Sequence, residues 1–244
     1  MTKTLEEEVA AAVDSDLLFG KFSYLLGSII FLLVAASLIG NDRLSCILFC
    51  VLMTGVLLVS AVTICRHHRN LIPALSLAIP TIIFDWLGFA MANQMVFVVH
   101  NLLLVLFFSF VAYHVLYSIL ADERVTLDTI RGAVCVYLLV GLAWTYVYGT
   151  MQLVDSGAIE FPGTDVQTTV SAFGNSSFTQ TAYYSFTTMT TLGFGDIHPV
   201  LPPARTASIL QAIFGQFYLA VLVARLVVLH IGFRSGAEGS NQRN

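Results

Sequence analysis

Two glycines, Gly193 and Gly195, alternate with Leu192 and Phe194, and Asp196 follows them. Glycine adopts backbone angles that residues with a Cβ avoid, so successive carbonyl groups in such a segment can point to the same side instead of alternating as in an ordinary strand. A row of carbonyl oxygens on one side can replace the hydration shell of a cation. This spacing would therefore allow the backbone carbonyls to coordinate a cation.

The residues before this segment predict a short helix that would position it. From Phe178 to Met189 the chain reads FTQTAYYSFTTM, which is aromatic and apolar but too short to cross a bilayer. Such a length suits a re-entrant helix. Its carbonyl end would fall near Met189 or Thr190, next to residues 191–195, which we call the glycine segment. The helix dipole favours a cation at that end.

The composition places the whole chain in a membrane. Of the 244 residues, 57% are hydrophobic and only 11% are charged, which is outside the range of soluble globular domains. We expect an all-α membrane protein with six transmembrane helices, and with the re-entrant helix and its glycine segment between the fifth and the sixth. The six apolar stretches are Phe22–Ile39, Leu44–Cys65, Leu71–Ala92, Met95–Leu120, Gly132–Val154 and Thr206–Gly232.

Residues 188–196, T-M-T-T-L-G-F-G-D, resemble the pore signature of potassium channels, usually written T-x-x-T-x-G-Y-G with a following aspartate. The resemblance covers roughly residues 178–231, and its continuation is similar to bacterial members of that superfamily. It implies a potassium-selective channel subunit with K⁺ as the permeant ion and no other cofactor. It also implies that the filter runs from Thr191 to Gly195, with K⁺ held by the carbonyls of Thr191, Leu192, Gly193 and Phe194 and by the Thr191 hydroxyl.

The GFGD element occurs once in the chain, so a single chain cannot surround a pore with four filters. We therefore expect a homotetramer in the lipid bilayer. Two other readings stay open: a nonselective cation channel, and a subunit of a potassium transporter, although related uptake systems typically carry four divergent pore loops in one chain.

By the same resemblance, residues around the filter support it: Thr188 and Thr190 in the signature, and Tyr183 and Tyr184 as an aromatic cuff. Membrane-interface anchoring is the other interpretation of the two tyrosines. Asp196 would either attract cations at the outer mouth or fix the end of the filter by hydrogen bonding.

Two filter residues depart from the commonest pattern, with Phe194 in place of tyrosine and Leu192 in place of valine or isoleucine. A phenylalanine lacks the hydroxyl that could tie the filter to its cuff. We expect selectivity to be kept and the filter to be less rigid against slow closure.

The last apolar stretch is expected to line the pore. Helical spacing puts Ala212, Gln216, Leu219 and Val223 on one face, which we assign to a water-filled cavity. Gln216 would be a polar wall of that cavity or would make an interhelical hydrogen bond. Gly215 lies where the resembled family commonly has a hinge, and close helix packing explains a glycine there equally well.

Arg225 lies near the inner end of the same stretch. Four arginines facing a cation pore would oppose conduction, so we expect this side chain to point away from it. It would either form a salt bridge with Asp122, Glu123 or Asp128, coupling the preceding linker to the inner helix, or extend to the lipid interface.

Charge distribution predicts the orientation of this multi-pass protein in the cell membrane. Of the 11 lysines and arginines, only Arg43 and Arg205 lie outside when both termini are cytoplasmic, which agrees with the positive-inside rule. The expected regions are a cytoplasmic segment 1–21, a four-helix transmembrane domain 22–120, a cytoplasmic linker 121–131, a pore domain 132–232 and a cytoplasmic tail 233–244. The tail is too short for a regulatory domain and is expected to be disordered, so a separate regulatory subunit would have to supply soluble control.

The first four apolar stretches give fewer indications of function. The fourth contains no arginine or lysine, so it lacks a charged voltage sensor and we expect weak or absent voltage gating. Asp85, in the third, is an intramembrane carboxylate. It could serve as a proton or ligand sensor, or it could form a hydrogen bond with a neighbouring helix.

Other classes of function find no support. The formal charge of −4, with acids clustered at the N-terminus, argues against nucleic-acid binding. The sequence contains no HExxH motif, phosphate-binding loop or nucleophile elbow, so we do not expect an enzyme.

Overall fold

The computed structural model describes residues 20, 22–40, 43–65, 71–91, 93–121, 126–161 and 175–241. Within these ranges the chain is helical apart from turns and two strands of two residues each, β1 (Ile159–Glu160) and β2 (His198–Pro199). The helices are α2 (Ser23–Leu38), α3 (Arg43–Cys65), α4 (Leu71–Met91), α5 (Gln94–Ala121), α6 (Leu127–Val154), α8 (Asn175–Met189) and α9 (Pro202–Asn241).

Five of the described helices, α3, α4, α5, α6 and α9, are long and apolar enough to cross a membrane. The expectation of an all-α membrane protein is therefore confirmed. The sequence predicted six crossings, and the remaining candidate, α2, is shorter than the other five helices. Its 16 residues span about 24 Å, against about 30 Å for a hydrocarbon core.

Two predicted boundaries differ from the structure because local signals extend the helices. α6 begins at Leu127 instead of Gly132, since the Thr126 side chain accepts a hydrogen bond from the N–H of Thr129 in a capping box. α9 begins at Pro202, a residue favoured in the first turn of a helix.

The far end of α9 corrects the expected disordered tail. The helix does not end at Gly232 but runs to Asn241. Residues 233–241 contain no proline to stop it, so a helix that is already formed can continue through them.

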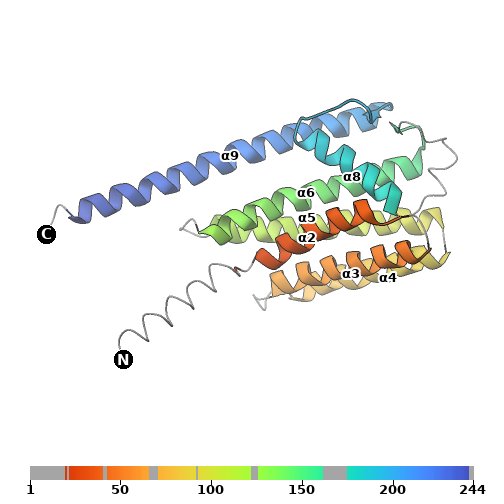
Figure 1. Ribbon diagram of the computed structural model, residues 1–244, viewed down its shortest axis with the longest axis horizontal. Helices are drawn as coiled ribbons and strands as arrows, with labels where there is room; N and C mark the ends of the chain where they lie inside the picture. The colour runs from red at the N-terminus through yellow and green to blue at the C-terminus, as the bar shows by residue number, and fades with distance from the viewer. Residues whose placement is uncertain are drawn as a thin grey trace.

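The helices form a bundle along which α5 and α6 lie side by side (Figure 1). α4 packs on α5, α3 packs on α4, and α2 lies against both α3 and α6. The short helix α8 packs against α6, and α9 runs along the edge of the bundle beside α8 and α6 (Figure 1). In this arrangement α6 is the central element.

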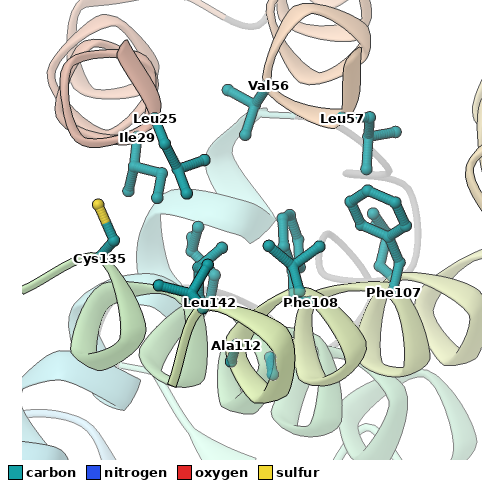
Figure 2. Close-up of a cluster of buried hydrophobic side chains, with 14 of the residues drawn as sticks. Leu25, Ile29, Val56, Leu57, Phe107, Phe108, Ala112, Cys135 and Leu142 are labelled. Atoms are coloured by element: carbon teal, nitrogen blue, oxygen red, sulfur yellow. The ribbon is translucent and has the colours of Figure 1, made fainter. Parts of the chain in front are cut away.

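The main core lies between α2 and α3 on one side and α5 and α6 on the other (Figure 2). Lipid tails are as apolar as leucine, so the close packing of these side chains holds the helices together more than their removal from water does. The labelled buried residues are Leu25, Ile29, Val56, Leu57, Phe107, Phe108, Ala112, Cys135 and Leu142.

A second, smaller core lies where α6 ends. β1 and β2 pair antiparallel, with Ile159 opposite Pro199 and Glu160 opposite His198. Tyr148 and Ile159 are buried here with side chains of α8 and α9. The ladder thus ties the chain that leaves α6 to the chain that enters α9.

Candidate functional site

The glycine segment has an alternating backbone. Thr191, Gly193 and Gly195 have positive φ angles of 57°, 48° and 81°, and Thr191 is the one non-glycine residue with positive φ in the described ranges. Because every second residue takes the left-handed conformation, successive carbonyls turn toward one side of the segment. The two glycines were expected to do this, whereas the left-handed Thr191 was not foreseen.

Thr191 takes this conformation because it ends α8. The N–H of Leu192 donates to the Thr187 carbonyl at 2.9 Å, and the N–H of Thr191 donates to the Thr188 carbonyl at 3.0 Å. These two bonds define a Schellman motif, in which the left-handed position usually holds glycine. A β-branched residue there is strained by about 1–2 kcal/mol, as is common at functional sites.

Two threonine hydroxyls at this end of α8 donate to backbone carbonyls. Thr190 Oγ1 donates to the Phe186 carbonyl at 2.7 Å, and Thr191 Oγ1 donates to the Thr190 carbonyl at 2.7 Å. Gln216 Nε2 of α9 lies 3.4 Å from Thr191 Oγ1. The polar side chain expected on the pore-facing side of α9 therefore contacts Thr191, where the glycine segment leaves α8.

Tyr183 joins two parts of the segment that follows α8. Its ring stacks on Phe194 with centroids 6.3 Å apart and planes 6° apart. Its hydroxyl donates to Asp196 Oδ2 at 2.9 Å. This contact is the kind expected if Asp196 fixes the end of the segment by hydrogen bonding.

The neighbouring Tyr184 faces the other way. It is buried, its hydroxyl bonds the Ser208 hydroxyl of α9, and its ring lies edge-on to Tyr148 of α6 at 4.7 Å between centroids. Of the two adjacent tyrosines, Tyr183 therefore contacts the residues that follow α8, and Tyr184 contacts the neighbouring helices α6 and α9.

A buried polar network behind α8 was not foreseen. Gln211 of α9 is fully buried, accepts a hydrogen bond from the Tyr148 hydroxyl at 2.6 Å, and donates to Ser185 Oγ at 2.8 Å. Ser185 Oγ in turn donates to the Gly141 carbonyl at 2.7 Å. The network joins α6, α8 and α9. A glutamine within an apolar stretch was the signal that could have indicated it.

Gly215 sits where α9 crosses the end of α8. A Cβ at this position would lie 2.4 Å from the Met189 carbonyl oxygen, closer than real Cβ contacts allow. The helix runs through Gly215 without interruption. Of the two interpretations of this glycine, close packing has direct support here.

The expected pore-facing side of α9 is open in the single chain. Gln216, Leu219 and Val223 are exposed and Ala212 is half-buried. Arg225 points elsewhere, since its Nη2 donates to the Leu120 carbonyl of α5 at 3.0 Å.

Two of the acids considered as partners of Arg225, Asp122 and Glu123, lie outside the described residues. The third, Asp128, accepts a hydrogen bond from the Phe22 N–H at 3.1 Å. The contact with Leu120 therefore connects the inner end of α9 to the end of α5, on the side where the linker begins.

Comparison with known families gives one match. A family model described as "Ion channel" matches residues 136–230, from within α6 to within α9. The chain has no match among curated proteins or solved structures. The match covers the glycine segment, the two tyrosines and the buried network, whereas α2 to α5 lie outside it.

Proposed function

We propose, from the match of residues 136–230 to an ion channel family, that the chain is one subunit of a homotetrameric, potassium-selective channel. K⁺ passes without an added cofactor through a filter made by residues 191–195 of four chains. The match to an ion channel family favours a channel over an enzyme.

The alternating backbone at Thr191, Gly193 and Gly195 is the observation that carries this proposal. It supplies the row of carbonyl oxygens that a dehydrated K⁺ requires. The residues that bear these carbonyls are exposed in the single chain, with Leu192 57% and Phe194 66% exposed. Backbone polar groups at membrane depth cannot face lipid, so this segment must face a water-filled axis or other protein. Three further copies around one axis satisfy that requirement.

The rest of the proposed architecture follows from charge and length. α2, extended by Phe22 and Ile39, is the sixth crossing, at a length of about 27 Å for 18 residues. Both termini are then cytoplasmic, and the ladder of β1 and β2 lies at the outer mouth beside the filter. α5 contains no lysine or arginine, so the channel is not strongly gated by voltage.

The direct test is a reversal potential recorded from the purified full chain in planar bilayers, with K⁺ on one side and Na⁺ on the other. Each tenfold preference for K⁺ displaces the reversal potential by about 59 mV. A potential near zero with clear currents would identify the nonselective cation channel, and flux without channel-like openings would favour the transporter reading.

A matched pair of variants makes this test specific. Gly195→Ala places a Cβ on a residue with φ of 81° and is expected to abolish selectivity or current. Gly157→Ala, in the turn after α6 where no such angle occurs, is the control and should behave as the original chain. Native mass spectrometry of both should give four chains per complex, and any other number would contradict the proposal.

A further inference from the structure

An acid and a base face each other inside the bundle, away from the glycine segment. Asp85 of α4 and His100 of α5 are 8% and 7% exposed, and His100 Nε2 lies 3.5 Å from Asp85 Oδ1. Within the described part of the chain, Asp85 Oδ2 has no hydrogen-bond partner, while the Cys50 thiol donates to the same carboxylate and the Thr81 backbone bonds His100. Buried polar groups are normally paired, and an unpaired oxygen of a buried carboxylate is costly. The pair is thus incompletely satisfied by the protein.

Both side chains line a cavity of about 110 Å³ between α3, α4, α5, α6 and α8. Five aromatic side chains contribute to its remaining wall. Phe178 of α8 lies 5.0 Å from Phe49 and 5.9 Å from Tyr146 between ring centroids. Phe89 and Phe97 complete the aromatic lining. A carboxylate among aromatic faces is a setting that recognises cations through charge and through the ring quadrupole.

The wall favours an organic cation over a metal ion. In the portion of the chain that is described, no three His, Cys, Asp or Glu side chains come together in a metal-binding arrangement. The other titratable groups that line the cavity are His100 and Tyr146, with Cys46 and Cys50 from α3. Thiol, phenol and neutral imidazole add no charge, so Asp85 sets the sign of the site.

The cavity also limits the size of the occupant. A cavity of about 150 Å³ lined by apolar residues accepts benzene, with its six carbons. On that scale a cavity of about 110 Å³ takes about four non-hydrogen atoms.

We propose that this cavity binds a small primary alkylammonium ion. Its N–H groups donate to the Asp85 carboxylate. Rotation about χ2 of Asp85, a broad two-fold torsion, allows either carboxylate oxygen to accept these hydrogen bonds. Its alkyl chain lies against the rings of Phe49, Phe97 and Phe178. Because Phe178 and Thr181 belong to α8, an occupant contacts the helix that carries the glycine segment. The proposal concerns binding and does not depend on which ion the pore conducts.

The test is calorimetric titration of the purified full chain in detergent, with K⁺ in excess, using n-propylammonium and its neutral isostere 1-propanol. We expect saturable binding of n-propylammonium and at least tenfold weaker binding of 1-propanol. Asp85→Asn keeps the shape of the side chain and should weaken n-propylammonium binding at least tenfold. Glu160→Gln, which changes an exposed acid of β1 that does not line the cavity, should leave the affinity unchanged.

A second readout covers the case in which Asp85→Asn fails to assemble. Cys46 lines the cavity and is only half-buried, so n-propylammonium should slow its reaction with a methanethiosulfonate reagent in the unaltered chain, whereas 1-propanol should not. Three results would overturn the proposal: no saturable binding, which would mean a cavity filled by water only; equal binding of the neutral alcohol; or equal protection of Cys46 by both compounds.

Discussion

α6 and α9 both belong to the region that matches the ion channel family, yet their surroundings differ. Over their most apolar stretches, α6 is 56% buried within its own chain and α9 only 17%. α6 is covered by α2, α5, α8 and α9, whereas α9 contacts its own chain mainly through α8 and α6. The matched region therefore contains one helix that its own chain largely covers, α6, and one that its own chain leaves mostly exposed, α9.

The difference identifies the part of the molecule that the proposed tetramer would complete. The open side of α9 carries Gln216, Leu219 and Val223, and the exposed glycine segment lies next to Gln216. Lipid can cover leucine and valine but gives nothing to a backbone carbonyl or an amide. Variants that alter the few contacts of α9 with its own chain test this difference between α6 and α9.

The largest effect is expected at Gly215, where α9 meets the end of α8. Gly215→Ala would put a methyl group 2.4 Å from the Met189 carbonyl oxygen. Because that oxygen belongs to the backbone and cannot easily move, we expect the free energy of unfolding to fall by about 3 kcal/mol. Thermal unfolding of the detergent-solubilised complex measures this, and the current should fall with it.

Gly55→Ala in α3 is the control for that variant, since a Cβ there meets nothing within 4 Å. Both changes give the same gain in helix propensity, so the difference between them isolates the contact between α8 and α9. If both variants melted alike, α9 would not be held at Gly215.

A smaller effect is expected from the buried network that joins α9 to α6. Gln211→Leu removes the acceptor of the Tyr148 hydroxyl and the donor to Ser185 Oγ, at a cost of about 2 kcal/mol in the free energy of unfolding. Tyr148→Phe in the same chain removes the hydroxyl that lost this acceptor, so the double variant should lose less than the sum of the single variants. Strictly additive losses in the unfolding measurements would show that the two side chains are not coupled.

The smallest effect is expected at the filter itself, on a rate rather than on stability. Phe194→Tyr adds a hydroxyl beside the ring of Tyr183 and should slow inactivation. Tyr183→Phe removes the bond to Asp196 and should speed it. A net hydrogen bond of about 1 kcal/mol corresponds to about a fivefold change in rate.

Tyr113→Phe, at an exposed position of α5, is the control for both filter variants and should leave the current decay unchanged. Macroscopic currents after a step to K⁺-containing solution give the three rates. Unchanged kinetics in both filter variants would rule out this account of filter rigidity.

What the sequence revealed about the site was local. Alternating glycines, a short apolar stretch before them and the absence of charges along whole spans are properties of neighbouring residues, so the region of α8, the glycine segment and the start of α9 could be outlined in advance. The left-handed Thr191 could not, because only the position where α8 stops makes it the end of a Schellman motif.

Contacts between distant residues were out of reach for a different reason. The packing of Gly215 on Met189 and the bonds of Gln211 depend on how α9 crosses α8, which no spacing within α9 specifies. The partner of Asp85 was accessible in principle. α4 ends at Met91 and α5 begins at Gln94. Asp85 and His100 are equally far from these two helix ends, so an antiparallel helix pair brings them level.

The length of α9 has a mechanical consequence. Its 40 residues make a rod of about 60 Å, roughly twice the thickness of a hydrocarbon core. Gly215 lies in the first half, so roughly 40 Å of helix extends beyond the fulcrum at Met189. A rotation of about 5° there would swing the far end by roughly 3 Å, so a force applied to that end acts on the Met189 contact with a long lever arm.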